Sequence, residues 1–144
     1  MSVEGLLVAL LPVSATNAAT RARAVGCLRA LVGLVMIAAP KAVARIGAEG
    51  EPTGSFSLLM RTVGIRDLVL GIGTVAAAQA GVDETRRWIG MGLLSDALDS
   101  ATGAVSGSLV GRRSALTAAA IPVPVIVADL WALAGSPAQS SSVD

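Results

Sequence analysis

The stretch RTVGIRDLVLGIG, residues 61–73, places two arginines and an aspartate in an otherwise apolar run. All of its charges lie between Arg61 and Asp67, and the residues that follow are small or apolar. A surface helix of a soluble protein needs a continuous polar face for water, and this stretch has none. We therefore interpret it as part of a lipid-buried helix that carries charge into the membrane.

The composition of the whole chain also favours a membrane protein. Of its 144 residues, 53% are hydrophobic and 15% are charged, and the mean hydropathy is +0.73. Ordinary soluble domains contain about 25% charged residues. A chain of this length forms about one domain, and its excess of apolar surface needs a solvent other than water.

Several kinds of chemistry are excluded by the residue types that the chain lacks. Without His it cannot build a His-ligated metal or haem site, a Ser-His-Asp triad or a Cys-His pair. Lone Cys27 cannot form an internal disulfide and is interpreted as a small apolar residue. The net charge of +1 and the 2% content of aromatic residues argue against nucleic-acid binding. We expect no metal and no cofactor.

Four long apolar segments predict the fold. Each approaches the ~20 residues that a helix needs to cross the hydrocarbon core. The links between them are short and contain Gly, Pro or charged residues, which favours antiparallel neighbours. The sequence therefore predicts an all-α fold, an integral membrane up-down four-helix bundle over residues 24–135. The four segments are residues 24–45, 56–80, 86–109 and 114–135, and PVP at 122–124 predicts a kink in the last.

The two ends of the chain are expected to lie outside this bundle. Residues 1–23 contain the apolar run GLLVALLPV followed by polar residues, which predicts a short N-terminal interfacial or flexible segment. A cleaved signal peptide is the alternative, but no Lys or Arg precedes the apolar run and Pro12 interrupts it. Residues 136–144 are mostly small and polar and are predicted to be a disordered tail.

One observation goes against a membrane location. The longest uncharged stretches in the second and fourth segments, residues 68–82 and 114–128, fall short of the 18 or more uncharged residues typical of a span. The alternative is a soluble, Ala-rich helical bundle, which would need the polar face that these segments lack. The positive-inside rule gives no orientation, because the two predicted sides hold equal numbers of cations. One side holds Arg21, Arg23, Arg86 and Arg87, and the other holds Lys41, Arg45, Arg112 and Arg113.

The predicted membrane segments contain several charged residues. Each costs about 2.5–3.5 kcal/mol at a helix centre, so we expect them to pair inside the bundle. Arg29 also lies in a segment, and we expect Arg29 and Arg61 to be shallow enough to reach the membrane surface. The predicted polar network consists of Arg61, Arg66, Asp67, Asp96, Asp99 and Asp129.

Small residues are spaced so that helices carrying these charges can approach closely. Steps of three and four residues place side chains on one helix face, and small residues on such a face let two backbones meet. This spacing relates Gly64, Asp67 and Gly71 in the second segment, Gly26, Ala30 and Gly33 in the first, and Gly92, Asp96, Asp99, Gly103 and Ser106 in the third.

The pairing inside the network can be predicted from side-chain geometry. We expect Arg66 to fork between Asp96 and Asp99, because a guanidinium binds carboxylates through fixed parallel donors. Asp67 would then pair with Arg61 or Arg29, or cap a turn. Asp129 has no cationic neighbour in its own segment, so its partner must come from another helix.

Three stretches give the chain its resemblance to known proteins: LVGLVMIAAP (31–40), RTVGIRDLVLGIG (61–73) and DALDSATG (96–103). In these stretches and in its layout, the chain resembles small bacterial integral membrane proteins similar in architecture to the DoxX-like group. The resemblance spans roughly residues 24–134 and implies a compact four-helix transmembrane domain. It implies little about function, because that group has no common activity that can be assigned residue by residue to this chain.

Three kinds of function fit this pattern. The first is a multi-pass cell-membrane protein, either an accessory subunit or a binder of a lipid or lipophilic small molecule, which forms a homo-oligomer or joins a larger complex. In such a protein, the polar network can have a purely structural role, in which it fixes the register of the helices. The second is a cofactor-independent isomerase or cyclase, with Asp96 or Asp99 as general acid or base and Arg66 stabilising negative charge. The third is transport, which needs a water-accessible path.

Overall fold

The computed structural model describes residues 3–45 and 53–134, and every regular element in these ranges is an α-helix. The predicted all-α class is therefore confirmed. The predicted tail, residues 136–144, lies outside the described residues. The helices are α1 (Val3–Ala38), α2 (Pro40–Ala44), α3 (Gly54–Ala80), α4 (Val82–Val105), α5 (Gly107–Val110), α6 (Arg112–Ala120) and α7 (Val123–Ala134).

The ends of the helices follow from local sequence. Thr53 caps α3, because its side-chain oxygen accepts a hydrogen bond from the amide of Phe56 at 3.2 Å. Gly81 separates α3 from α4 with a φ of 141°, and Gly111 precedes α6 with a φ of 83°, values that glycine adopts without steric cost. A turn at Ile121 and Pro122 separates α6 from α7, at the kink that PVP predicts.

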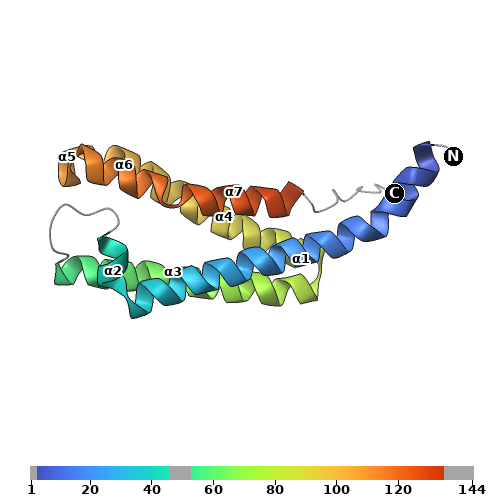
Figure 1. Ribbon diagram of the computed structural model, residues 1–144, viewed down its shortest axis with the longest axis horizontal. Helices are drawn as coiled ribbons and strands as arrows, with labels where there is room; N and C mark the ends of the chain where they lie inside the picture. The colour runs from blue at the N-terminus through green and yellow to red at the C-terminus, as the bar shows by residue number, and fades with distance from the viewer. Residues whose placement is uncertain (1–2, 46–52, 135–144) are drawn as a thin grey trace.

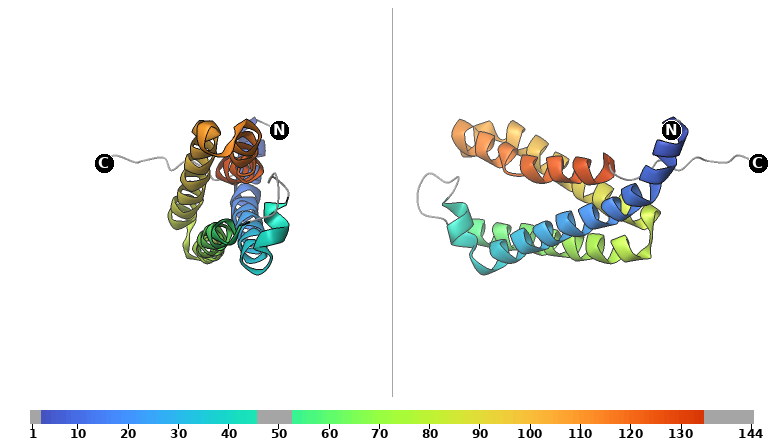
Figure 2. Two further views of the ribbon diagram at one scale, coloured as in Figure 1. Left: turned by 90° about the vertical axis from the view of Figure 1, so that its left-hand side faces the viewer. Right: turned by 45° about the vertical axis from the view of Figure 1, so that its right-hand side comes forward.

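The helices form two layers (Figure 1). In the first layer α1 and α3 run antiparallel along each other, with α2 beside the start of α3. From Gly81, α4 leads into the second layer, where α6 and α7 run back along it (Figure 2). The first turns of α1 project beyond the other helices. Helix α1 runs without a break through residue 23, and the interfacial or flexible character of residues 1–23 stays a prediction.

The backbones of α1 and α3 touch at glycines. A Cβ built on Gly33 would lie 2.5 Å from the carbonyl oxygen of Gly64, and one on Gly71 would lie 2.5 Å from that of Gly26. Real Cβ atoms do not approach backbone so closely, so only glycine fits at these positions. The contact aligns Gly26 with Gly71 and Gly33 with Gly64. Arg29 lies between the two glycines of α1, and Asp67 lies between the two glycines of α3. The contact therefore brings Arg29 opposite Asp67.

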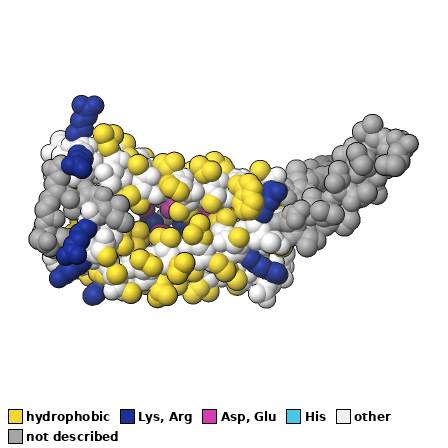
Figure 3. Space-filling view, viewed as in Figure 1, with side chains coloured by type: hydrophobic (Ala, Val, Ile, Leu, Met, Phe, Trp, Pro, Cys, Tyr) yellow, Lys and Arg dark blue, Asp and Glu magenta, His cyan; other side chains and the backbone are white. Residues whose placement is uncertain are grey.

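The exterior of the protein is apolar and much of its interior is polar. Leucines such as Leu31, Leu58 and Leu109 are 58%, 67% and 84% exposed, while the buried hydrophobic residues are mostly alanines. Hydrophobic side chains cover the middle of the molecule, and Lys and Arg side chains lie at both of its ends (Figure 3). This arrangement is the reverse of that in a soluble protein. The buried polar residues are Arg29, Asp67, Thr74, Thr85, Asp96 and Asp129.

Within the described residues, one helical stretch is long and apolar enough to cross a membrane by length and composition. It is Arg112–Ala134, with a mean hydropathy of 1.9, and it includes the turn between α6 and α7. Charged residues interrupt the other long helices, for example Arg29 in α1 and Asp67 in α3. A single stretch of this kind gives weak support for membrane association.

Candidate functional site

Arg29 lies at the centre of a buried ion-pair cluster. Its Nη2 donates to Asp96 Oδ2 at 2.5 Å and to Asp129 Oδ2 at 2.7 Å. Its Nη1 donates to Oδ1 of Asp67 and to Oδ1 of Asp96, both at 3.4 Å. All four residues are buried, and Arg29 is only 2% exposed. One guanidinium therefore joins α1 to α3, α4 and α7.

Arg66 forms the accessible side of the same cluster. Its Nη1 donates to Asp99 Oδ2 at 2.6 Å, and its Nε and Nη2 donate to Asp67 Oδ1 at 3.2 and 3.0 Å. Its Nη2 also lies 3.7 Å from Asp96 Oδ1. The side chains of Arg66 and Asp99 are 30% and 38% exposed, whereas that of Asp96 is 5% exposed. The cluster thus has a buried half around Arg29 and an accessible half at Arg66 and Asp99.

The glycine spacing in α4 makes room for this cluster. A Cβ on Gly92 would lie 2.9 Å from Nη2 of Arg29, so the guanidinium occupies the space that the missing side chain leaves. Asp96 lies one turn further along the same face of α4 and receives two hydrogen bonds from that guanidinium. The face of α4 that the spacing of Gly92 and Asp96 predicts is therefore the face that contacts Arg29.

The structure brings together five of the six residues predicted for the network: Arg66, Asp67, Asp96, Asp99 and Asp129. Arg61 lies elsewhere, exposed at the end of the molecule near α2. Arg66 lies within ion-pair distance of both Asp96 and Asp99, at 3.7 and 2.6 Å, as expected, but its hydrogen bonds differ from the expected fork. Arg66 hydrogen-bonds Asp99 and Asp67, while Asp96 receives its hydrogen bonds from Arg29.

The central role of Arg29 is the feature that sequence reasoning missed, although its pairing with Asp67 was one of the expected alternatives. A signal for it was present in the sequence. Arg29 follows Gly26 by three residues and precedes Gly33 by four, which is the spacing that relates Asp67 to Gly64 and Gly71. When each of two touching helices carries a charged residue between two such glycines, the two charged residues face each other at the contact.

The cluster contains two guanidinium groups and four carboxylates. In the part of the chain that the structure describes, Asp99 Oδ1 receives no hydrogen bond. Ser100 Oγ is the one buried side-chain nitrogen or oxygen in that part without a partner. Ser100 lies one turn from Asp96 on the same face of α4. Ser100 Oγ is buried, so it is through Asp99 Oδ1 that the accessible half of the cluster can accept a hydrogen bond from a further group.

The described acidic residues do not form a metal site. Among the residues of 3–45 and 53–134, no three His, Cys, Asp or Glu are arranged to hold a metal ion. Five of the carboxylate oxygens in the cluster already face guanidinium groups. The site in these residues is thus an ion-pair network.

The chain was compared with protein-family models, with curated proteins and with solved structures. None of the three comparisons finds a match.

Proposed function

We propose that the protein is a multi-pass membrane protein that binds the polar head of a lipophilic molecule at Arg66 and Asp99. The observation that carries this proposal is the accessible half of an ion-pair cluster within an apolar exterior. In Figure 3 the band of hydrophobic side chains is hollowed near its middle, and acidic and basic side chains are visible inside the hollow. A molecule dissolved in the lipid could reach the cluster from the side.

The exterior supports the membrane part of the proposal. Exposed Leu, Val and Ile side chains lie on α1, α3, α4, α6 and α7, where water would be an unfavourable neighbour. From Arg61 to Ala80, α3 rises about 30 Å, which matches the thickness of the hydrocarbon core. In this proposal α1, α3, α4 and the α6–α7 pair are the four membrane crossings, as in the DoxX-like group that the sequence resembles.

The native cysteine offers a test of the membrane location. Cys27 is exposed, and its neighbour Gly26 meets Gly71, which lies midway along the stretch of α3 proposed to cross the hydrocarbon core. We expect a water-soluble maleimide to leave Cys27 unlabelled in native membranes, because lipid covers it, and to label it after denaturation in detergent. Mass spectrometry of the protein measures the labelled fraction. The control is Asp83→Cys on a Cys27→Ala background, which places an exposed thiol beyond the end of α3 and should be labelled in permeabilised membranes. Equal labelling of both thiols in native membranes would contradict the proposal.

The unused acceptors indicate the class of ligand. Four carboxylates exceed the two guanidinium groups, so the cluster favours a group that donates hydrogen bonds or carries positive charge. Asp99 Oδ1 is the acceptor available to such a group, because it receives no hydrogen bond from the described residues and its side chain is 38% exposed. A long-chain alcohol or amine has this chemistry, with an apolar tail suited to the surrounding lipid.

Binding can be measured with two probes that differ by one donor. We expect hexadecanol to bind the purified protein, and hexadecyl methyl ether, which has no donor, to bind at least about tenfold more weakly. Asp99→Ala should remove this preference, because it deletes the accessible acceptor. Native mass spectrometry of the protein in neutral detergent measures both complexes. Equal binding of the two probes by the wild-type protein would count against the proposed ligand class.

A matched variant separates a lost acceptor from a general loss of charge. Glu84 also lies on α4 and forms an ion pair with Arg87, with Glu84 Oε1 and Arg87 Nη1 2.9 Å apart, but it is remote from the cluster. Glu84→Ala should leave the preference for hexadecanol unchanged. Circular dichroism on both variants checks that the helices are intact. The same loss in Glu84→Ala and Asp99→Ala would show that the probes do not report on the cluster.

The enzymatic alternative uses the same site. Asp99 is the most exposed of the four carboxylates, which favours it over Asp96 as the group that exchanges a proton with a substrate. Arg66 would then stabilise negative charge on a lipophilic substrate of an isomerase or cyclase. An organic extract of the purified protein distinguishes the two functions. Two isomers of one molecule in the wild-type extract, and one isomer in that of Asp99→Asn, would favour the enzyme.

A further inference from the structure

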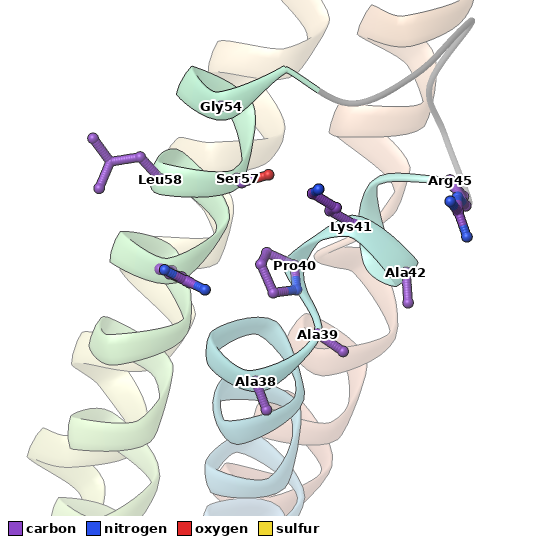
Figure 4. Close-up of a pocket in the computed structure, with 10 residues that line it drawn as sticks. Ala38, Ala39, Pro40, Lys41, Ala42, Arg45, Gly54, Ser57 and Leu58 are labelled. Carbon is purple, nitrogen blue, oxygen red and sulfur yellow. The ribbon is translucent and has the colours of Figure 1, made fainter.

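A second polar region lies at the end of the molecule, where α2 lies against α3. It is an open cavity of about 660 Å³, within the range of ligand sites in proteins. Helix α1 ends at Ala38, and Pro40 begins α2 at an angle to it, with the cavity between this turn and the first turns of α3 (Figure 4). The small side chains of Ala38 and Ala39 leave the space between the helices unfilled.

The cavity is lined by positive charge. Lys41, Arg45 and Arg61 line it from two sides, and no Asp or Glu is among the lining residues that the structure describes. Lys41 and Ser57 point toward each other across the cavity (Figure 4). Neither Lys41 nor Arg61 makes an ion pair within the described ranges of the chain. Two cations from different helices therefore converge on a space that holds no compensating carboxylate of these ranges.

We infer that this cavity binds a phosphate group. A lysine ammonium and an arginine guanidinium provide charge-assisted donors for phosphate oxygens, and a serine hydroxyl adds a neutral one. A phosphate would also supply the negative charge that the described lining of the cavity lacks. The chemistry is shared by phospholipid headgroups and soluble phosphates. The cavity lies beside α2 at one end of the molecule (Figure 1), where headgroups would meet a protein that spans the membrane. The inference is independent of Arg66 and Asp99.

The test uses two lipids that differ only in phosphate. Wild-type protein in neutral detergent is titrated with dioleoyl phosphatidic acid and with dioleoylglycerol, and native mass spectrometry measures the bound fractions. We expect phosphatidic acid to bind about tenfold more tightly or better. The double variant Lys41→Gln/Arg61→Gln should lose this preference, and the charge-preserving swap Lys41→Arg/Arg61→Lys should retain it. Both cations are exposed, so the double variant should fold, and circular dichroism checks this.

The control is Arg112→Gln, which removes an exposed cation elsewhere on the protein and outside the cavity lining. Its preference for phosphatidic acid should equal that of the wild type. Inorganic phosphate is then added to the complex with phosphatidic acid. If it displaces the lipid, the phosphate group alone is sufficient for binding; if it does not, the site requires a lipid headgroup. Equal binding of the two lipids, or an equal loss in Arg112→Gln and the double variant, would overturn the inference.

Discussion

Arg29→Met is expected to lower the free energy of unfolding by about 3–5 kcal/mol, which is a large fraction of the roughly 5–15 kcal/mol that stabilises a typical domain. Among the described residues, Arg29 carries the guanidinium that contacts all three of Asp67, Asp96 and Asp129. Its removal leaves Asp129 without its cation and Asp96 without its closest one, while Asp67 keeps Arg66. Methionine fills much of the same volume, so the expected loss is electrostatic. Unfolding by denaturant in detergent micelles, followed by circular dichroism, measures the effect.

Two further variants test this explanation. Arg23→Met removes an exposed arginine from the same helix and should change stability by less than about 0.5 kcal/mol. The triple variant Arg29→Met/Asp96→Leu/Asp129→Leu removes the cation together with two of its partners. Apolar replacement of a complete buried ion pair is often neutral or stabilising, so the triple variant should be more stable than Arg29→Met. Wild-type stability in Arg29→Met alone would refute the central role of this side chain.

Gly71→Ala and Gly90→Ala are expected to change stability in opposite directions, although both add one methyl group to a helix. At Gly71 the new Cβ would lie 2.5 Å from the amide nitrogen of Ala30 and from the carbonyl oxygen of Gly26, and backbone cannot move aside. The cost should be at least about 1–3 kcal/mol. At Gly90 nothing lies within 4 Å of the new Cβ. There the better helix propensity of alanine should add about 0.5–1 kcal/mol.

Thermal unfolding of both variants in the same detergent measures the difference. The contrast excludes a general effect of alanine on helical stability, because propensity alone predicts a gain at both positions. It also tests the register of α1 against α3, since Gly71 meets Gly26 only in this alignment. A stabilised Gly71→Ala would mean that the two backbones do not touch there.

The sequence predicted the helices well because their signals are local. Apolar runs of near-membrane length indicated the four long helical stretches, and Gly81, Gly111 and PVP marked breaks that the structure contains. The acidic half of the cluster was also predictable. Asp96 and Asp99 follow the glycine spacing of α4, and a short carboxylate on a close-packed face needs a cationic partner.

The pairing within the cluster was harder to predict because it depends on where several helices meet. An arginine has a long side chain that can extend to a membrane surface or turn inward, and the sequence does not distinguish these conformations. Arg29 turns inward because Gly92 leaves a space for it and three aspartates surround that space. Arg61 lies at the other extreme, near Lys41 at the end of the apolar band.

The position of Arg29 along the chain has a consequence for biosynthesis. Its partners lie 38, 67 and 100 residues further toward the C-terminus, so a ribosome completes Arg29 long before any of them. An unfinished chain carries this cation without the carboxylates that neutralise it, and uncompensated charge inside a protein is costly. The last partner, Asp129, is supplied only by α7. Release from quality-control machinery should therefore require the complete chain, because a product truncated before α7 lacks part of the interior that holds α1 in place.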